Sequence, residues 1–168
     1  MARQERQFPY GAIEMVEATR TRGTILCAGG PSGPNGMAIG WITIGSIWGR
    51  PICTVLARPS RHTFTVMETG DSFTVNLLSE KLQDAVTLFG TKSGRDGDKF
   101  AEAGVTAAKG RVVASPYIAE ADLVIECKIA ARTPLDPKLF SADFVRDCYR
   151  QDDHHMVYYG EIASIHIK

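Results

Sequence analysis

The chain has 168 residues, enough for one domain, and its shares of hydrophobic (44%) and charged (23%) residues are those of an ordinary globular protein. Its 19 basic and 19 acidic residues give a formal net charge of zero, so we expect no broad basic face for nucleic acid or an anionic membrane. The four cysteines form no CxxC pair, which argues against a tetrahedral zinc site and against a dithiol redox motif.

Short apolar segments and turn residues alternate through the first half of the chain. The segment 31–36 (PSGPNG) consists of turn-forming residues and predicts a turn. Residues 61–68 predict a short helix, with Ser60 as its N-cap and Gly70 as its stop. Buried strands are predicted over residues 23–30, 37–48, 51–57 and 72–78.

Further helices and two long strands follow. The segment after Ser79 predicts a helix because four apolar residues recur on one face, namely Leu82, Ala85, Val86 and Phe89. Residues 98–104 predict a helical turn, and residues 133–153 an excursion with a short helix. In residues 122–132, outward Glu126 and Lys128 alternate with the core positions Leu123, Ile125, Cys127 and Ile129. In the last strand, one face consists of Val157, Tyr159, Ala163, Ile165 and Ile167.

The pattern as a whole favours a mainly β fold of the barrel type, because long strands outweigh short helices and no βαβ rhythm occurs. Cys53 and Cys127 lie inside apolar runs and are expected in the core. The N-terminal segment lacks the apolar stretch of a signal peptide, and no apolar run is long enough to cross a membrane. We therefore expect one domain over residues 1–168, in the cytoplasm, with free thiols.

Polar side chains gather where the strand 51–57 gives way to the helix. The first turn of a helix has unpaired N–H groups and the positive end of the helix dipole, which together attract anions. Ser60 and Thr63 add hydroxyl groups, and the guanidinium of Arg58 suits a phosphate. The stretch predicts a phosphate site, although Ser60 as a plain N-cap and Arg58 as a solvated charge also fit the local pattern.

A second polar segment, residues 90–100, combines glycines with cationic and hydroxyl side chains. Donors to ligand oxygens are available from Lys92, Ser93, Arg95 and Lys99. A solvated loop in which lysine and aspartate neutralise one another is the alternative. The run Asp152–His155 does not predict a metal site, because neighbouring histidines on a strand point to opposite faces. Trp41 and Trp48 fit either a planar ligand or the core.

Five motifs follow one another along the chain: NGMAIGW (35–41), RPSRHT (58–63), FTVNLL (73–78), SGRDGDKF (93–100) and DHHMVYYGEI (153–162). From about Gly11 to the C-terminus, the chain resembles the flavin reductase-like family, in particular its flavoredoxin type. This resemblance implies a Greek-key-like, six-stranded split barrel that binds FMN, or FAD in its place, near the interface of a homodimer. NAD(P)H is the implied co-substrate, and an electron-acceptor protein or a monooxygenase is the implied partner.

The same resemblance implies candidate site residues. The flavin phosphate would be held by Arg58, Ser60 and Thr63. The ring would lie against residues 37–45, where Trp41, Ile42 and Thr43 are the implied contacts; Asn35, just before this stretch, is a further one. The resemblance also implies that four residues close over the ring: Asn76, Ser93, Gly94 and Lys99. His155 is implied as a catalytic side chain near the nicotinamide.

The sequence departs from the family pattern in two places. The family commonly has threonine or serine where Ala38 or Ile39 stands, and the segment 135–151 has no close counterpart. Two functions fit: an oxidoreductase that transfers electrons from NAD(P)H to flavin or an acceptor, and a non-catalytic flavin-binding electron carrier reduced by another enzyme. A third possible function is that of a barrel that binds another phosphorylated ring, such as pyridoxal phosphate, or a haem-type ligand.

Overall fold

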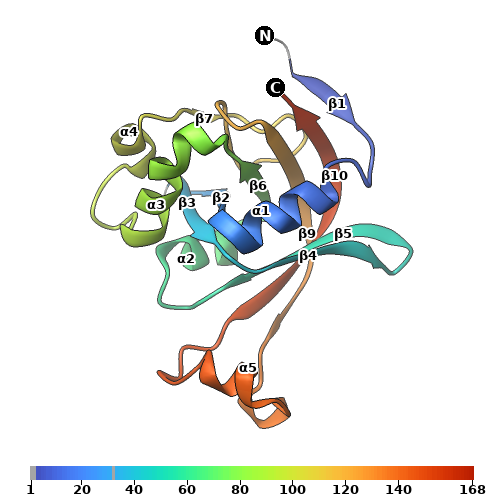
Figure 1. The fold of residues 1–168 in the computed structure, drawn as a ribbon, viewed down its shortest axis with the longest axis vertical. Coiled ribbons are helices and arrows are strands. Elements are labelled where there is room, and N and C mark those ends of the chain that lie inside the picture. The colour runs from blue at the N-terminus through green and yellow to red at the C-terminus, as the bar shows by residue number, and fades with distance from the viewer. Residues whose placement is uncertain (1–2, 32) are drawn as a thin grey trace.

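An antiparallel sheet dominates the fold (Figure 1). The computed structural model describes residues 3–31 and 33–168. Among these residues, eight strands form the main sheet in the order β3-β2-β6-β9-β10-β5-β4, with β1 paired to β10. Their bounds are β1 Gln4–Arg6, β2 Thr24–Gly30, β3 Gly33–Ile39, β4 Ile42–Ile47, β5 Arg50–Ala57, β6 Ser72–Leu77, β9 Leu123–Pro134 and β10 Met156–Ile167. A separate two-stranded sheet joins β7 (Ala107–Ala108) to β8 (Tyr117–Ile118).

The predicted mainly β class is confirmed, and the sheet curls into a split barrel. β3 and β4 stand at the two ends of the strand order, yet only Gly40 and Trp41 separate them in the chain. The chain therefore crosses an open seam of the barrel at these two residues. The described sheet has eight strands rather than the expected six. Two reasons are the short β1, which adds to β10, and the break that divides the predicted strand 37–48 between β3 and β4.

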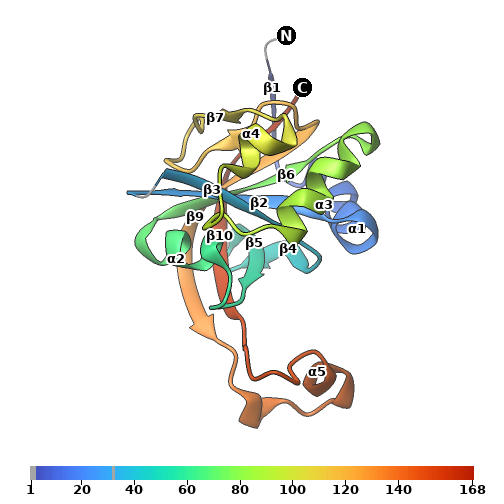
Figure 2. The same ribbon diagram turned by 90° about the vertical axis from the view of Figure 1, so that its left-hand side faces the viewer.

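Short helices flank the sheet (Figure 2). Their bounds are α1 Ala12–Arg22, α2 His62–Thr69, α3 Gln83–Thr91, α4 Lys99–Ala103 and α5 Asp143–Asp147, with 3₁₀ turns η1 at Glu80–Leu82 and η2 at Pro137–Leu139. The helices after Ser60 and Ser79 are confirmed, whereas α1 was not predicted. Its buried side chains are only Met15, Ala18 and Thr19, too narrow a stripe to give a clear periodic signal. Within the described ranges, no helix is long and apolar enough to cross a membrane.

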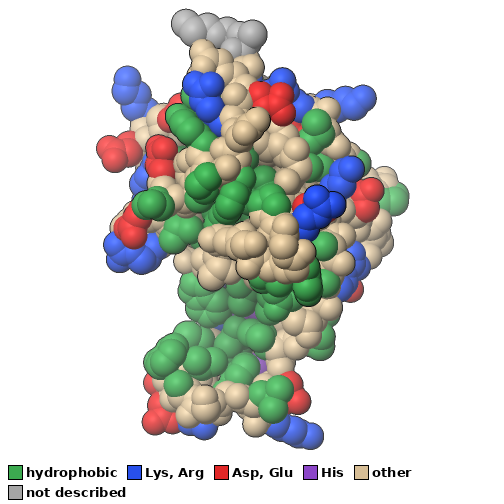
Figure 3. Space-filling model, turned by 90° about the vertical axis from the view of Figure 1, so that its right-hand side faces the viewer, with side chains coloured by type: hydrophobic (Ala, Val, Ile, Leu, Met, Phe, Trp, Pro, Cys, Tyr) green, Lys and Arg blue, Asp and Glu red, His purple; other side chains and the backbone are tan. Residues whose placement is uncertain are grey.

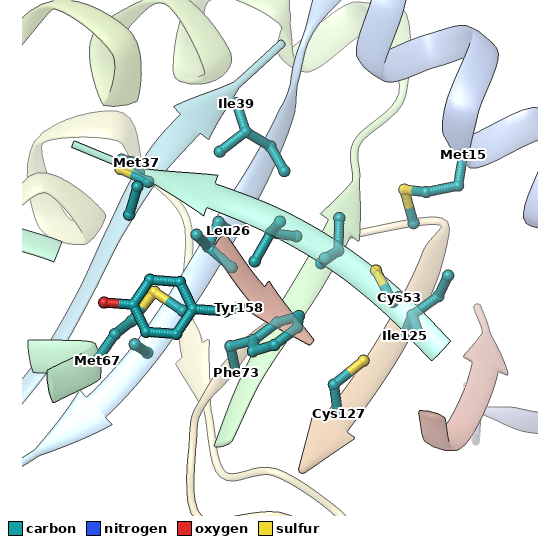
Figure 4. Packing of buried hydrophobic residues seen from close by; sticks show 14 of the residues in the cluster. Met15, Leu26, Met37, Ile39, Cys53, Met67, Phe73, Ile125, Cys127 and Tyr158 are labelled. Carbon is teal, nitrogen blue, oxygen red and sulfur yellow. The ribbon is translucent and has the colours of Figure 1, made fainter. Parts of the chain in front are cut away.

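Alternate side chains of β2 enter two separate cores. Leu26 and Ala28 point into the barrel, while Ile25 and Cys27 pack against the outer layer that contains α3. Figure 4 shows the barrel core, where Tyr158 of β10 lies beside Met67 of α2 and Met15 of α1 lies on the opposite side of the cluster. Cys53 and Cys127 are fully buried in this core, as expected. Each large apolar side chain buried in this way stabilises the fold by about 1.5–3 kcal/mol.

The predicted turn over residues 31–36 is wrong for most of its length. β3 begins at Gly33 and pairs with β2 from there onward. Pro34 is tolerated because β3 is at the edge of the sheet, where one side of the strand donates no ladder hydrogen bonds. Ser32 lies outside the described residues.

The single apolar face predicted for the last strand is also wrong. The pairing of β10 with β9 shifts between Ile162 and Ser164, which leaves Ala163 as the extra, exposed residue of a bulge. A bulge exchanges the two faces of a strand. Tyr158 therefore reaches the barrel core on one side of the bulge, and Ile165 reaches it on the other.

The expected outward position of Glu126 is wrong as well, because its side chain is fully buried. Its carboxylate accepts hydrogen bonds from the backbone N–H groups of Arg111 (2.9 Å) and Val112 (2.8 Å). It also hydrogen-bonds to Nε2 of His166 at 2.9 Å. A buried carboxylate is tolerated when such donors surround it. Glu126 thus attaches the loop before β8 to the barrel.

Residues 135–155, which we call the arm, connect the far ends of β9 and β10. Figures 1 and 2 show the arm projecting beyond the barrel, at the end opposite to the two chain termini. It contains η2 and α5, so the predicted excursion with a short helix is confirmed. The open seam of the barrel and the base of the arm together position the candidate site.

Candidate functional site

A groove follows the open seam of the barrel. Its larger part has a volume of about 310 Å³ and lies between the start of α2, the end of α3 and the loop before α4. Its smaller part, about 150 Å³, lies between the β3–β4 link, the end of β5 and His155. The two parts share Met37, Ala38 and Arg61 and are therefore continuous. The larger part alone reaches the lower end of the usual range for ligand pockets, about 300–1,000 Å³.

The larger part, which we call the polar end, contains the start of α2. Arg61 is the N-cap residue, and no side chain caps the first turn, so its N–H groups remain available to an anion. Thr63 is buried, and its Oγ1 accepts a hydrogen bond from Nδ2 of Asn35 at 2.8 Å. The hydroxyl hydrogen of Thr63 is then free to be donated elsewhere. Arg61 itself is exposed and lies where the two parts of the groove meet.

Lys99 supplies a second cation at the polar end. Its side chain is only 4% exposed, and Nζ donates to the carbonyl oxygens of Phe89 (3.3 Å) and Lys92 (3.2 Å). Burial lowers the pKa of Lys99 to about 8; Cys27 opposes this shift and Arg61 adds to it. A bound anion would restore the missing opposite charge beside this ammonium group.

The loop before α4 closes this end, and Gly94 is the residue that allows it. A methyl group at Gly94 would overlap the side-chain amide of Asn35 and lie 2.9 Å from Cδ2 of His62. Ser93 and Gly94 both line the polar end. Arg95 secures the loop, since its Nη1 donates to the carbonyl oxygen of Ser60 at 3.1 Å.

The smaller part is bordered by Ile39, Leu56 and the indole of Trp41, after which we call it the apolar end. Arg58, Arg61 and His155 border it as well. Trp41 is 42% exposed, and its ring lies 4.9 Å from that of His155, centroid to centroid. Nδ1 of His155 is 2.7 Å from the hydroxyl of Tyr149. Burial lowers the pKa of His155 to about 4, and the cation of Arg58 adds to this shift. The imidazole is therefore neutral at pH 7.

Arg58 and Ser60, both expected at the phosphate, form hydrogen bonds with the arm. Arg58 donates to the carbonyl oxygens of Asp153 and Cys148, each at 2.9 Å. The hydroxyl of Ser60 donates to Oδ2 of Asp153 at 2.6 Å. The predicted N-cap role of Ser60 is wrong, because Arg61 takes that position. Within the groove, Arg58 borders the apolar end and Ser60 borders the polar end, where its hydroxyl hydrogen is already donated to Asp153.

The groove brings most of the remaining predicted residues together: Asn35, Trp41, Thr63, Ser93, Gly94, Lys99 and His155. Ile42 and Thr43 lie beyond it, in β4, paired with β5. Asn76 is fully buried in β6, where its amide bonds to Ile25, Thr74 and Ile118. Arg61 and His62 also line the polar end, although neither was predicted as a site residue. Their place at the first turn of the helix, within the RPSRHT motif, was the signal for them.

The class of protein that the structure defines is a split barrel with a groove along its open seam. A family model described as "Flavin reductase like domain" matches residues 18–168. The chain therefore belongs to the flavin reductase-like family, and the predicted resemblance is confirmed.

Solved structures share this fold. The flavoredoxin of Desulfovibrio vulgaris (Miyazaki F) is 23% identical, with a TM-score of 0.69 over 88% of this chain and 70% of that one. An FMN-binding domain of a flavin reductases-like enzyme from Shewanella baltica OS155 is 15% identical, with a TM-score of 0.70 over 99% of this chain and 77% of that one. A curated protein of Aeropyrum pernix, described as uncharacterized, is 35% identical over 80 residues, 47% of this chain. The match spans 30% of that relative's length.

Proposed function

We propose that the groove binds FMN, with the phosphate at the polar end and the ring at the apolar end. On this basis, the protein is an oxidoreductase that transfers electrons from NAD(P)H to the flavin or to an acceptor. One observation supports this most directly. The uncapped start of α2, Arg61, Thr63 and Lys99 converge at one end of a groove whose other end is bordered by Trp41 and Ile39.

The residues present fit such a ligand. A phosphate monoester has a charge of about −1.5 to −2 at neutral pH, which two cations and a helix start can balance. The buried ammonium of Lys99 has no carboxylate partner among the described residues. At the apolar end, Ala38, Ile39 and Gly40 offer no side-chain donor, so polar atoms of a ring would meet backbone groups there. A methyl group at Gly40 would meet no protein atom within 4 Å, which leaves room for a close approach.

When bound, FMN would supply the electron-transfer chemistry. The residues of this chain would anchor and orient it: Arg61, Thr63 and Lys99 would hold the phosphate, and Trp41 and Ile39 would keep water from the ring. Neutral His155 would offer a hydrogen-bonding group without adding a charge. We further propose a cytoplasmic location, and an acceptor protein or a monooxygenase as the recipient of the electrons.

The absorbance spectrum of the purified protein, before and after addition of FMN or FAD, tests the binding step. We expect a flavin spectrum and saturable binding of FMN. Oxidation of NADH and of NADPH is then followed at 340 nm with and without flavin. Protein that stays colourless and takes up no flavin would contradict the proposal. Tight flavin binding without nucleotide oxidation would assign the electron-carrier role instead. The spectrum of another bound ring would indicate a barrel for pyridoxal phosphate or a haem-type ligand.

A further inference from the structure

A tyrosine of the arm reaches back to the apolar end of the groove. Of residues 135–154, all of them described, only Tyr149 is buried; its side chain is 8% exposed. The preceding helix α5 buries none of its residues. Burial of a single side chain on a segment whose other residues are exposed or half-buried indicates a specific contact rather than a general core.

Three neighbours hold the ring of Tyr149 in place. Phe140 and His154 stack on it, with centroids at 5.3 and 5.1 Å and interplanar angles of 29° and 25°. The guanidinium of Arg58 lies over the ring, 5.1 Å from its centroid. Arg58 also donates to the carbonyl oxygens of Cys148 and Asp153, on either side of Tyr149 in the chain. The direction of the Tyr149 hydroxyl is thereby restricted.

This hydroxyl lies 2.7 Å from Nδ1 of His155 and has no other hydrogen-bond partner in the described part of the chain. Burial raises the pKa of Tyr149, although Arg58 opposes the shift, so the hydroxyl keeps its proton at neutral pH. A neutral imidazole has one nitrogen that donates and one that accepts. If Tyr149 donates to Nδ1, the ring hydrogen of His155 must be on Nε2. Nε2 forms no hydrogen bond with any described residue, and His155 borders the apolar end.

We propose that Tyr149 is a positioning residue, which fixes His155 as the Nε2–H tautomer and so presents a neutral donor to a carbonyl oxygen bound at the apolar end of the groove. The carbonyl oxygen belongs either to the flavin ring or to the carboxamide of the nicotinamide, and in this respect the inference rests on the proposed function. The charged groups that face His155 are Arg58, Arg61 and Asp153. The two cations disfavour a third positive charge and keep the donor neutral.

The tautomer can be measured by two-bond ¹H–¹⁵N spectra of the ¹⁵N-labelled full chain. The chain has four histidines, and the signals of His155 are identified by their loss in His155→Gln. We expect a protonated Nε2 and an unprotonated Nδ1. Tyr149→Phe keeps the stacked ring and removes the hydroxyl, so we expect averaged shifts from two tautomers. Tyr159→Phe is the matched control, since that ring contacts Trp48 and not His155, and it should leave the spectrum unchanged.

A hydrogen on Nδ1 in the wild-type protein would overturn the proposal, whether or not the variant folds. An unchanged His155 spectrum in Tyr149→Phe would overturn it too. This measurement needs no flavin, so it decides the tautomer even if the protein binds no FMN and the proposed function fails.

Binding and kinetic measurements identify which carbonyl oxygen accepts the hydrogen bond from His155. Loss of the fixed donor should weaken one interaction by about 2- to 12-fold, the range for one neutral hydrogen bond. A weaker Kd for FMN in Tyr149→Phe would place the carbonyl on the flavin, and a higher KM for NAD(P)H with unchanged FMN affinity would place it on the carboxamide. If neither changes although the tautomer does, the donor acts on no carbonyl and the proposal is wrong.

Discussion

Arg58 and Arg61 lie three residues apart at the start of α2 but face different neighbours. Nη1 and Nη2 of Arg58 donate hydrogen bonds to backbone oxygens of the arm. The guanidinium group of Arg61 forms no hydrogen bond with any described residue, and Arg61 borders both parts of the groove. We therefore expect the phosphate interaction to depend on Arg61, and the attachment of the arm to depend on Arg58.

Arg61→Ala should weaken FMN binding roughly 10- to 150-fold, which corresponds to the loss of one charge-assisted hydrogen bond. Riboflavin binding should change little, because riboflavin has no phosphate. Isothermal titration with both flavins measures the difference. Arg58→Ala is the control: it should leave the ratio of the two affinities unchanged and instead increase hydrogen exchange over residues 147–153. Equal losses for FMN and riboflavin in Arg61→Ala would place the phosphate elsewhere.

Gly94→Ala should distort the polar end of the groove. The new methyl group has no room beside Asn35 and His62, so the loop before α4 must move away. We expect a loss of about 1–3 kcal/mol in the free energy of unfolding, typical of overpacking, together with weaker FMN binding. Denaturant unfolding and a flavin titration measure the two effects. Gly45→Ala is the matched control, since a methyl group there meets nothing within 4 Å; a similar loss in that variant would refute the steric explanation.

At the level of elements, polar groups attach the irregular segments to the barrel. The arm is held through Arg58 and Ser60, and the loop before β8 is held through Glu126. Burial alone would raise the pKa of Glu126. The hydrogen bonds from His166 and from the backbone N–H groups of Arg111 and Val112 outweigh it, and the pKa lies below its ordinary value.

Glu126→Gln should lower the free energy of unfolding at pH 7 by about 1.5–3 kcal/mol, because a neutral amide replaces a buried carboxylate that accepts hydrogen bonds from His166 and from two backbone N–H groups. A carboxyl group with a lowered pKa in the folded state contributes stability above its ordinary pKa of about 4.3 and loses it as the pH falls further. The difference between wild type and variant should therefore shrink as the pH falls below about 4. Urea unfolding from pH 7 to pH 3 measures this trend.

Glu161→Gln is the control for this series. Glu161 pairs with Arg50 at 3.4 Å on an exposed part of β10, and such pairs contribute about 0–1 kcal/mol. A difference between wild type and Glu126→Gln that stays constant with pH would show that the charge of Glu126 does not stabilise the loop.

At the scale of the whole molecule, apolar side chains continue from the barrel onto the arm. Figure 3 shows hydrophobic side chains on the barrel and on the arm below it. In the described part of the chain, the turn between β4 and β5 exposes Trp48 (64%), and the arm exposes Leu139 (79%) and Phe144 (75%). Extended apolar surface is typical of an interaction site. We propose that it contributes to a homodimer.

Sedimentation velocity should then give twice the mass of the chain. The unfolding temperature should rise with protein concentration, because dimer formation stabilises the folded state by mass action. Trp48→Glu and Phe144→Glu together should shift the equilibrium toward the monomer, while Ile13→Glu, on the exposed side of α1, serves as the control. A monomeric wild-type protein over the accessible concentration range would contradict the proposal.

Local patterns in the sequence were sufficient for the type of most elements. The apolar runs of β2, β5 and β6 and the spaced apolar residues of α3 each predict their own structure, because a strand or helix face is defined by neighbours a few residues away. The motif order was sufficient for the family. It also predicted one site for Asn35, Thr63, Ser93, Gly94 and Lys99, and these residues line the same part of the groove.

Only the tertiary structure decided the positions that depend on distant partners. Asp153 lies 95 residues after Arg58 and commits that guanidinium to the arm. His166 and the loop before β8 make a buried position possible for Glu126, and a single bulge at Ala163 exchanges the faces of β10. Each of these outcomes is set by pairing across the sheet or by long-range hydrogen bonds. Neighbouring residues in the chain predict neither the strand pairing nor these long-range hydrogen bonds.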